Sequence, residues 1–128
     1  MYNLIYRDGA PENTGHYEVF EKIAGSGKAL TVGQLVSVTN GIASEYESGK
    51  PYGVVAINAA DGEDAVAVLR ITDDMIFSAP LTGDASIGST LKHTGSGVGT
   101  TTTAGYGFEV TEVVSDKLVK GRFVNLDA

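Results

Sequence analysis

The sequence contains no cysteine and no tryptophan, and only three of its 128 residues are proline. Without cysteine the chain forms neither a disulfide nor a metal site with thiolate ligands. The sequence therefore does not indicate whether the protein resides in an oxidising or a reducing compartment. Basic residues are also scarce, since nine Lys and Arg stand against sixteen Asp and Glu, which gives a formal net charge of −7. A surface of this sign repels a phosphate backbone, so we expect no nucleic-acid partner.

Long apolar runs are missing as well. The N-terminal stretch MYNLIYRDGAPENTG has no apolar run of the length that a signal peptide needs, and no segment approaches the roughly 20 residues of a membrane span. We therefore expect a protein that is soluble where it is made and that has no membrane partner. Hydrophobic residues still make up 42% of the chain, which suits a single domain with its own core.

Glycine, by contrast, is abundant, with 17 residues, and predicts many tight turns between short elements. Apolar, β-branched and alternating segments predict strands at 30–38, 52–57, 65–71, 75–77, 108–114 and 118–124. Asn40-Gly41 predicts a tight hairpin, and Asp61-Gly62 and Asp73-Asp74 predict turns. No window has convincing helical spacing, with at most a helical turn near 84–91. The expected fold is all-β, a small compact barrel or sandwich.

Two segments differ from this strand pattern. Residues 1–16 begin with the apolar MYNLIY and continue with turn-forming residues, which indicates a flexible, extended N-terminal arm on a single β domain at 17–128. This arm either tucks under its own domain or adds a strand to a neighbouring protein. Residues 94–107 form a stretch rich in Gly and Thr that predicts a mobile loop, although its four consecutive threonines also suit one exposed strand.

The stretch IAGSGKAL at residues 23–30 is similar to a phosphate-binding loop, but it lacks three required features. Lys22 occupies the position of the first glycine, and Ala29 lacks the hydroxyl that would bind magnesium. The residues that follow predict a strand rather than a helix whose N-terminus would hold the phosphate. We therefore interpret these glycines as a turn and expect no cofactor.

Catalytic and metal-binding patterns are equally weak. His16 and His93 are the only imidazoles, and neither stands in the spacing of a metal site or of a nucleophile. The acidic residues 61–64 lack the alternating ligands of an EF-hand, so we expect no metal site. A small hydrolase that uses His93 with Asp84 or Ser96 is the weakest of the function classes, and we expect the protein not to be an enzyme.

Arg70 is the most informative charge, because it lies in an apolar strand that is predicted to be covered on both faces. Burying an unpaired guanidinium costs several kcal/mol, so this side chain should meet a carboxylate or reach an interface. Asp73 and Asp74 are too close in sequence to be assigned as its partners.

Several segments together resemble a tailed-phage head decoration protein. They are residues 29–38 with Gly33, the Asn40-Gly41 turn, the run GKPYGVVAINAADGEDAVAVLRITDDMIFSAPLTG and the ending VKGRFV, and they cover most of residues 24–124. The resemblance implies a β-rich, β-tulip-like module without enzymatic activity. It further implies a homotrimer that binds the outer shell of the phage head and clamps neighbouring subunits of the major capsid protein. Such a protein is made in the bacterial host cytoplasm and resides on the capsid surface of the virion.

The residues that we expect to contact the capsid are Tyr2, Leu4, Ile5, Tyr6 and Arg70. An extended arm adds a strand to a sheet edge of the capsid, while side chains such as Leu4 and Tyr6 fill pockets. A trimer strengthens weak single contacts by raising their effective concentration. Two alternatives stay open. One is a carbohydrate- or cell-surface-binding β module that uses Tyr106 and the Gly/Thr-rich loop, and the other is a tail or baseplate component.

Overall fold

The structure is a computed structural model that describes residues 1–7 and 17–127. Within these residues the chain forms eleven strands and no helix. The strands are β1 (Asn3–Arg7), β2 (Tyr17–Lys22), β3 (Leu35–Thr39), β4 (Ile42–Glu45), β5 (Gly53–Val55), β6 (Ala65–Arg70), β7 (Met75–Pro80), β8 (Thr90–His93), β9 (Val98–Thr101), β10 (Tyr106–Ser115) and β11 (Leu118–Asn125). The predicted all-β class is therefore confirmed.

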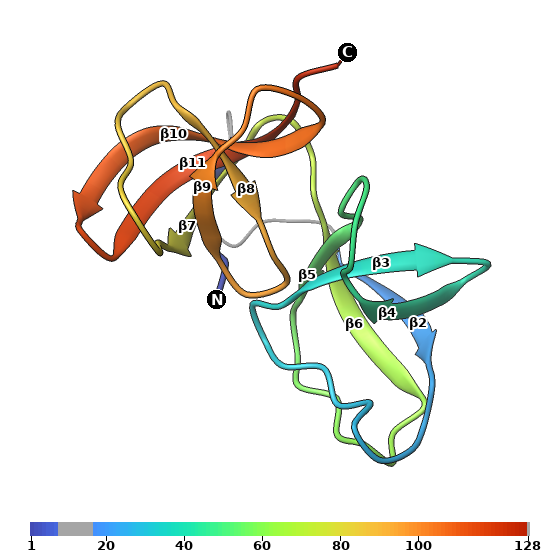
Figure 1. Ribbon diagram of the computed structural model, residues 1–128. Coiled ribbons are helices and arrows are strands. Elements are labelled where there is room, and N and C mark those ends of the chain that lie inside the picture. Colours follow the sequence, from blue (N-terminus) through green and yellow to red (C-terminus); the bar gives the residue numbers. More distant parts are fainter. Residues whose placement is uncertain (8–16, 128) are drawn as a thin grey trace.

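The strands form a closed barrel and a second sheet, which lie side by side in Figure 1. The barrel contains five strands in the order β2-β4-β3-β5-β6, and the parallel pair β2–β4 closes it. The other sheet contains six strands in the order β1-β7-β11-β10-β8-β9. No helix of the described residues has the length and apolar character needed to cross a membrane.

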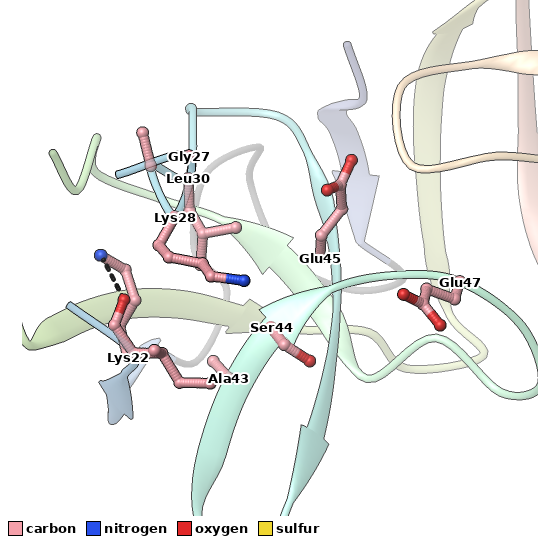
Figure 2. Close-up of a pocket in the computed structure, with 10 residues that line it drawn as sticks. Lys22, Gly27, Lys28, Leu30, Ala43, Ser44, Glu45 and Glu47 are labelled. Atoms are coloured by element: carbon pink, nitrogen blue, oxygen red, sulfur yellow. Dashed lines mark hydrogen bonds between the residues drawn. The ribbon is translucent and has the colours of Figure 1, made fainter. Parts of the chain in front are cut away.

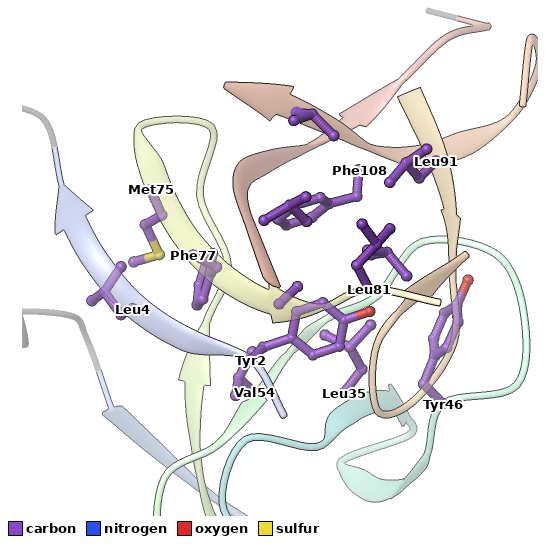
Figure 3. Close-up of a cluster of buried hydrophobic side chains, with 14 of the residues drawn as sticks. Tyr2, Leu4, Leu35, Tyr46, Val54, Met75, Phe77, Leu81, Leu91 and Phe108 are labelled. Carbon is purple, nitrogen blue, oxygen red and sulfur yellow. The ribbon is translucent and has the colours of Figure 1, made fainter. Parts of the chain in front are cut away.

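Two hydrophobic cores hold this arrangement together. The core inside the barrel consists of Leu30, Val36, Ala43, Val55, Ala59, Val66 and Val68. The second core lies where the outer wall of the barrel meets the six-stranded sheet, and Figure 3 shows its side chains. Its largest fully buried members are Tyr2, Leu35, Met75, Phe77, Leu91, Phe108, Val110 and Val119.

Neighbouring residues of the barrel strands face different cores. On β6, Val68 points into the barrel and Leu69 points into the second core, because successive side chains of a strand lie on opposite faces. The pair Val54 and Val55 on β5 is divided in the same way. Each fully buried side chain of this size stabilises the fold by about 1.5–3 kcal/mol. The prediction that the apolar strand near residue 68 is covered on both faces is confirmed for these positions.

The N-terminal residues belong to the six-stranded sheet. β1 pairs antiparallel with β7, in the register Asn3 to Ser78 and Leu4 to Phe77. The backbone amide of Tyr2 donates a hydrogen bond of 2.8 Å to the carbonyl oxygen of Gly33. Of the two alternatives for the arm, the structure shows the tucked one for residues 1–7, whereas residues 8–16 of the predicted arm lie outside the described residues.

Residue Gly33 interrupts the strand that was predicted over residues 30–38. Its φ is 89°, and a Cβ there would lie 2.5 Å from the Cβ of Met1. Leu30 consequently forms only an isolated bridge to Ala59, and β3 begins at Leu35. The predicted extent of this strand is wrong, because its period of two continues through a residue where the chain turns to meet the N-terminus.

The turns were predicted more accurately. Asn40 and Gly41 have φ values of 53° and 79° and join β3 to β4, which confirms the hairpin. Near residues 84–91 the helical turn is wrong, since this segment is a loop with a turn at Ile87-Gly88 before β8. Such short polar segments carry no periodicity that separates a helical turn from a loop.

Part of the stretch rich in Gly and Thr, which was expected to be a mobile loop or one exposed strand, forms strand β9 of a hairpin. β8 and β9 pair antiparallel, and the threonines Thr100 and Thr101 end β9 as exposed residues. The amide of Leu35 donates to the carbonyl oxygen of Gly95 over 2.8 Å, which anchors the hairpin turn to the barrel. The alternative of one threonine strand therefore describes this segment better.

Candidate interaction surfaces

Tyr2, the first capsid-contact candidate, is 1% exposed and lies in the second core (Figure 3). Its ring packs against Phe108 and Phe123, with ring centroids 6.1 and 5.3 Å away. Its hydroxyl lies 3.0 Å from the carbonyl oxygen of Thr94 and 2.6 Å from that of Gly97. Burial raises the pKa of this phenol far above its usual range, so the group stays a neutral donor.

The other candidates of the first strand are divided between core and surface. Leu4 is 8% exposed and packs in the same core, while Ile5 is half-buried beside a register shift in β1. The backbone of Tyr6 pairs with Ile76, but its side chain lies outside what the structure describes. The structure thus brings these residues into one strand, and it places Tyr2 and Leu4 inside this chain's own core.

Arg70 is separate from that group and lies exposed at the end of β6. Its guanidinium carbon is 5.5 Å from the ring centroid of Tyr52, in a cation–π arrangement. The Tyr52 hydroxyl in turn donates to a Glu18 carboxylate oxygen over 2.8 Å. Burial and this bonded carboxylate raise the pKa of Tyr52, while the nearby Arg70 opposes the rise. Among the described residues Arg70 makes no ion pair, and the Glu18 carboxylate is bonded to the Tyr52 hydroxyl instead.

An apolar surface runs over the outside of the barrel. On β2 the side chains of Tyr17 and Val19 point outward, with Val19 73% exposed, while Phe20 packs inward on the barrel core. Val19 lies opposite Ala67 of β6, whose carbonyl oxygen accepts a hydrogen bond of 2.9 Å from the amide of Ala56. The apolar residues Val19, Ala67 and Ala56 therefore lie on three neighbouring segments of the barrel.

Two loop residues extend this row. Ile57 follows Ala56 directly and is 67% exposed. Val32 is tied to the same segment, because its amide donates to the Asn58 side-chain oxygen over 2.7 Å. Val32 also lines a hollow of about 110 Å³ together with Tyr17. We refer to Tyr17, Val19, Val32 and Ile57 as the apolar face.

The apolar face was not found from the sequence, although a signal for it exists. A half-buried strand normally alternates apolar and polar residues, whereas Val19 and Phe20 are apolar on both faces of β2. An apolar residue on the second face indicates either a second packing layer or a contact surface. The sequence alone does not distinguish these two cases.

The loop IAGSGKAL covers one end of the barrel above a hollow of about 150 Å³, shown in Figure 2. Gly25 and Gly27 have φ values of 133° and 75°, so the glycines turn a corner as predicted. The amide of Ala29 donates to the Asp61 carboxylate over 2.8 Å, and the amide of Gly25 donates to the Asp61 carbonyl oxygen over 2.6 Å. These loop amides therefore hold the turn at Asp61.

Lys22 forms part of the wall of this hollow and is only 5% exposed. Its ammonium donates to the carbonyl oxygen of Ile23 over 3.0 Å, marked by the dashed line in Figure 2. Lys28, Glu45 and Glu47 line the same hollow, so both signs of charge meet there. Such a mixed lining does not favour a ligand of either sign.

His93 is held between two aromatic rings, with centroids 5.1 Å from that of Tyr46 and 5.5 Å from that of Phe123. Both of its ring nitrogens are buried and have no hydrogen-bonding partner in the described part of the chain. Burial lowers the pKa of His93, and an interaction with its own backbone opposes this effect only in part. The hydrogen-bonded arrangement of His93 with Asp84 or Ser96 that the hydrolase reading requires is not formed.

Metal ligands do not gather either, since residues 1–7 and 17–127 contain no group of three or more His, Asp or Glu side chains placed to hold an ion. Comparison of the chain with family models, with curated proteins and with solved structures gives no significant match. A proposal for the function therefore rests on the geometry of the described residues and on the sequence resemblance.

Proposed function

We propose that this chain is a non-enzymatic structural protein of a phage virion. In this proposal it binds the outer surface of the head as a homotrimer and stabilises the capsid by clamping neighbouring subunits of the major capsid protein. The apolar face is the observation that carries the proposal, because four large apolar side chains on neighbouring segments are exposed, and a grouping of this kind on a small protein marks a surface that binds another protein. The sequence resemblance over residues 24–124 supports a capsid as that partner.

The mode of contact differs from strand addition by a free arm. Tyr2 and Leu4 already fill this chain's own core, so in this proposal the apolar face and the exposed Arg70 make the contact. The barrel is closed, so its strands offer no free edge to the partner, and the free edges among the described strands are β1 and β9 of the other sheet. In this proposal the contact at the barrel is made by side chains, and groups that are already ordered lose little conformational entropy when they bind.

The apolar face is small, so one copy on its own binds weakly. Each large side chain that becomes fully covered contributes at most about 1.5–3 kcal/mol, and association itself costs several kcal/mol. Three copies joined in a trimer bind several capsid subunits at once and gain through effective concentration. Stable binding to the capsid therefore requires the trimer in this proposal.

Co-sedimentation of the purified protein with expanded heads of the phage that encodes it tests this function. We expect the wild type to bind, and we expect a Val19→Glu/Ile57→Glu double variant to bind at least tenfold more weakly. Ile87→Glu is the matched control, because Ile87 is equally exposed but lies in the loop before β8. A wild type that light scattering shows to be monomeric and that does not sediment with heads contradicts the proposal.

A second candidate function is a carbohydrate-binding module, as a specific observation supports it. Tyr106 is partly exposed and lines a hollow of about 170 Å³ with Asp73 and Asn125. Aromatic and polar side chains around a hollow of this kind suit a sugar ring. Saturable binding to a glycan array that Tyr106→Ala removes supports this function, and binding unaffected by that substitution excludes the hollow as its site.

A further inference from the structure

A groove of about 480 Å³ runs beside the end of β6, and neither the fold nor the apolar face accounts for it. Its volume lies within the roughly 300–1,000 Å³ that is usual for ligand sites. The aliphatic hydroxyl side chains of Ser37, Thr39 and Ser48 line it, together with Lys50, Tyr52 and Arg70. Val38, Pro51 and Ile71 add apolar surface.

The charge of the groove is opposite to that of the whole chain. Its lining contains Lys50 and Arg70 and no carboxylate, whereas the chain carries a net charge of −7. Glu18 bonds to Tyr52, and Asp73 shares a neighbouring hollow with Lys50, but neither carboxylate lines this groove. Two cations in a lining without a carboxylate create a local positive potential, which attracts an anionic group. The groove is thus complementary to an acidic ligand.

Arg70 is held in place for such a ligand. Its guanidinium lies over the Tyr52 ring, and Phe20 packs edge-on to that ring at 5.3 Å and 87°. The backbone of Tyr52 is fixed on both sides, since its amide donates to Val36 over 3.0 Å and its carbonyl accepts from Ile71 over 3.1 Å. A guanidinium held over a fixed ring has a restricted position, and its planar donors match a carboxylate in a bidentate way.

We propose that this groove binds an acidic side chain on an extended segment of a protein partner. Charge complementarity at Lys50 and Arg70 identifies the carboxylate, and the neighbouring Pro51 and Ile71 suit an apolar residue beside it. A saccharide fits less well, because Arg70 covers the Tyr52 face on which a sugar ring would stack. At the groove, residues 37–39 of β3 pair with β4 alone, because β3 meets β5 only at Leu35 and Val36. The proposed recognition uses the side chains of Lys50 and Arg70.

This inference deepens the proposed function, and it rests on that function only for the identity of the partner as a capsid subunit. The ligand chemistry follows from the groove itself. A capsid segment with an acidic residue at this place adds specificity and electrostatic attraction to the less specific contact of the apolar face.

The test is a titration of ¹⁵N-labelled protein with the peptide acetyl-Ala-Leu-Asp-Glu-Leu-Ala-amide, followed by amide chemical shifts. The neutral counterpart with Asn and Gln, inorganic phosphate and N-acetylneuraminic acid are titrated in parallel. We expect the acidic peptide to shift the amides of residues 50, 52, 53, 70 and 71 and to bind more weakly as salt is raised. The neutral peptide should produce no saturable shifts there.

Substitutions separate Arg70 from general charge. Arg70→Gln should weaken the acidic peptide about tenfold, while Lys117→Gln, which makes the same charge change in the exposed β10–β11 turn, should leave binding unchanged. Arg70→Lys should give an intermediate loss, because it keeps the charge without the planar donors. Tyr52→Phe keeps the ring under Arg70 and should bind the peptide as the wild type does.

Three results overturn the inference: equal binding of the neutral peptide, wild-type affinity in Arg70→Gln, or phosphate or N-acetylneuraminic acid binding at these residues as tightly as the acidic peptide. Its failure is distinguishable from that of the proposed function. Peptide binding by a protein that ignores phage heads contradicts the function alone. Head binding that persists when the acidic peptide does not bind contradicts the groove alone.

Discussion

Tyr2 and Thr94 are 92 positions apart in the chain, yet the Tyr2 hydroxyl donates a hydrogen bond of 3.0 Å to the Thr94 carbonyl oxygen. The Gly97 carbonyl oxygen lies 2.6 Å from the same hydroxyl. One proton serves both acceptors, so the hydroxyl bridges the two ends of the β8–β9 turn. The amide of Tyr2 also donates to the carbonyl oxygen of Gly33, which lies just before the barrel strand β3. A single residue at the N-terminus therefore joins the barrel to the six-stranded sheet.

Tyr2→Phe tests the value of this hydroxyl. The substitution keeps the ring contacts with Phe108 and Phe123 and removes only the donor, so we expect the free energy of unfolding to fall by about 1 kcal/mol. Urea unfolding followed by circular dichroism measures the change. Tyr17→Phe removes a hydroxyl from an exposed ring and should stay within about 0.5 kcal/mol of the wild type. Equal effects of the two substitutions would show that the buried hydrogen bonds contribute nothing specific.

Deletion of residues 2–7 tests whether the first strand is part of the stable fold. The deletion exposes the space filled by Tyr2 and Leu4, and two such side chains contribute together about 3–6 kcal/mol. Because a domain is stable by only about 5–15 kcal/mol in total, the truncated protein should unfold at far lower urea concentration or fail to fold. Asn3→Ala, at an exposed position of the same strand, is the control. A truncated protein with wild-type stability would mean that the strand acts only in binding.

Much of the fold could be predicted from short-range signals. The dipeptide Asn40-Gly41 specifies a hairpin because both residues accept a positive φ. Residues 115–117 separate two apolar segments that pair as β10 and β11. The consecutive apolar residues Val68 and Leu69 correctly indicated a strand covered on two faces. For the two turns the controlling interaction lies within a few residues of the pattern, and for Val68 and Leu69 the apolar character of both residues is the local signal.

The remaining features depend on partners that are distant in sequence. An apolar N-terminus reads equally well as a free arm or as an inner strand, and only the space between Met75, Phe77 and Phe108 decides for Tyr2 and Leu4. The sequence identifies Arg70 as an unusual charge in an apolar strand. It does not predict that Arg70 lies over Tyr52 or that it lines a groove, because these neighbours are also distant in sequence. Spatial convergence of surface side chains leaves no periodic signal in one sequence.

Acidification should destabilise the protein through His93. Burial lowers the pKa of this imidazole in the folded state below the ordinary value of 6.5. As pH falls below 6.5, the unfolded chain takes up a proton that the folded chain does not, so the free energy of unfolding decreases until the folded pKa is passed. Urea midpoints between pH 7.5 and 5.0 measure this effect. His93→Phe keeps an aromatic ring between Tyr46 and Phe123 and should show a smaller decrease, whereas an identical pH dependence would assign the effect to other groups.

Gly33 is the position where substitution by a small residue should be most informative about the junction with the N-terminus. An alanine there must adopt a φ near 89°, and its Cβ would meet the Cβ of Met1 and the backbone of Tyr2. Both effects oppose folding, so Gly33→Ala should lower the free energy of unfolding by about 1–3 kcal/mol. Gly62→Ala is the matched control, because no atom lies within 4 Å of the added carbon and φ there is not positive. If the two variants unfold at the same urea concentration, Gly33 does not hold the N-terminal strand against the barrel.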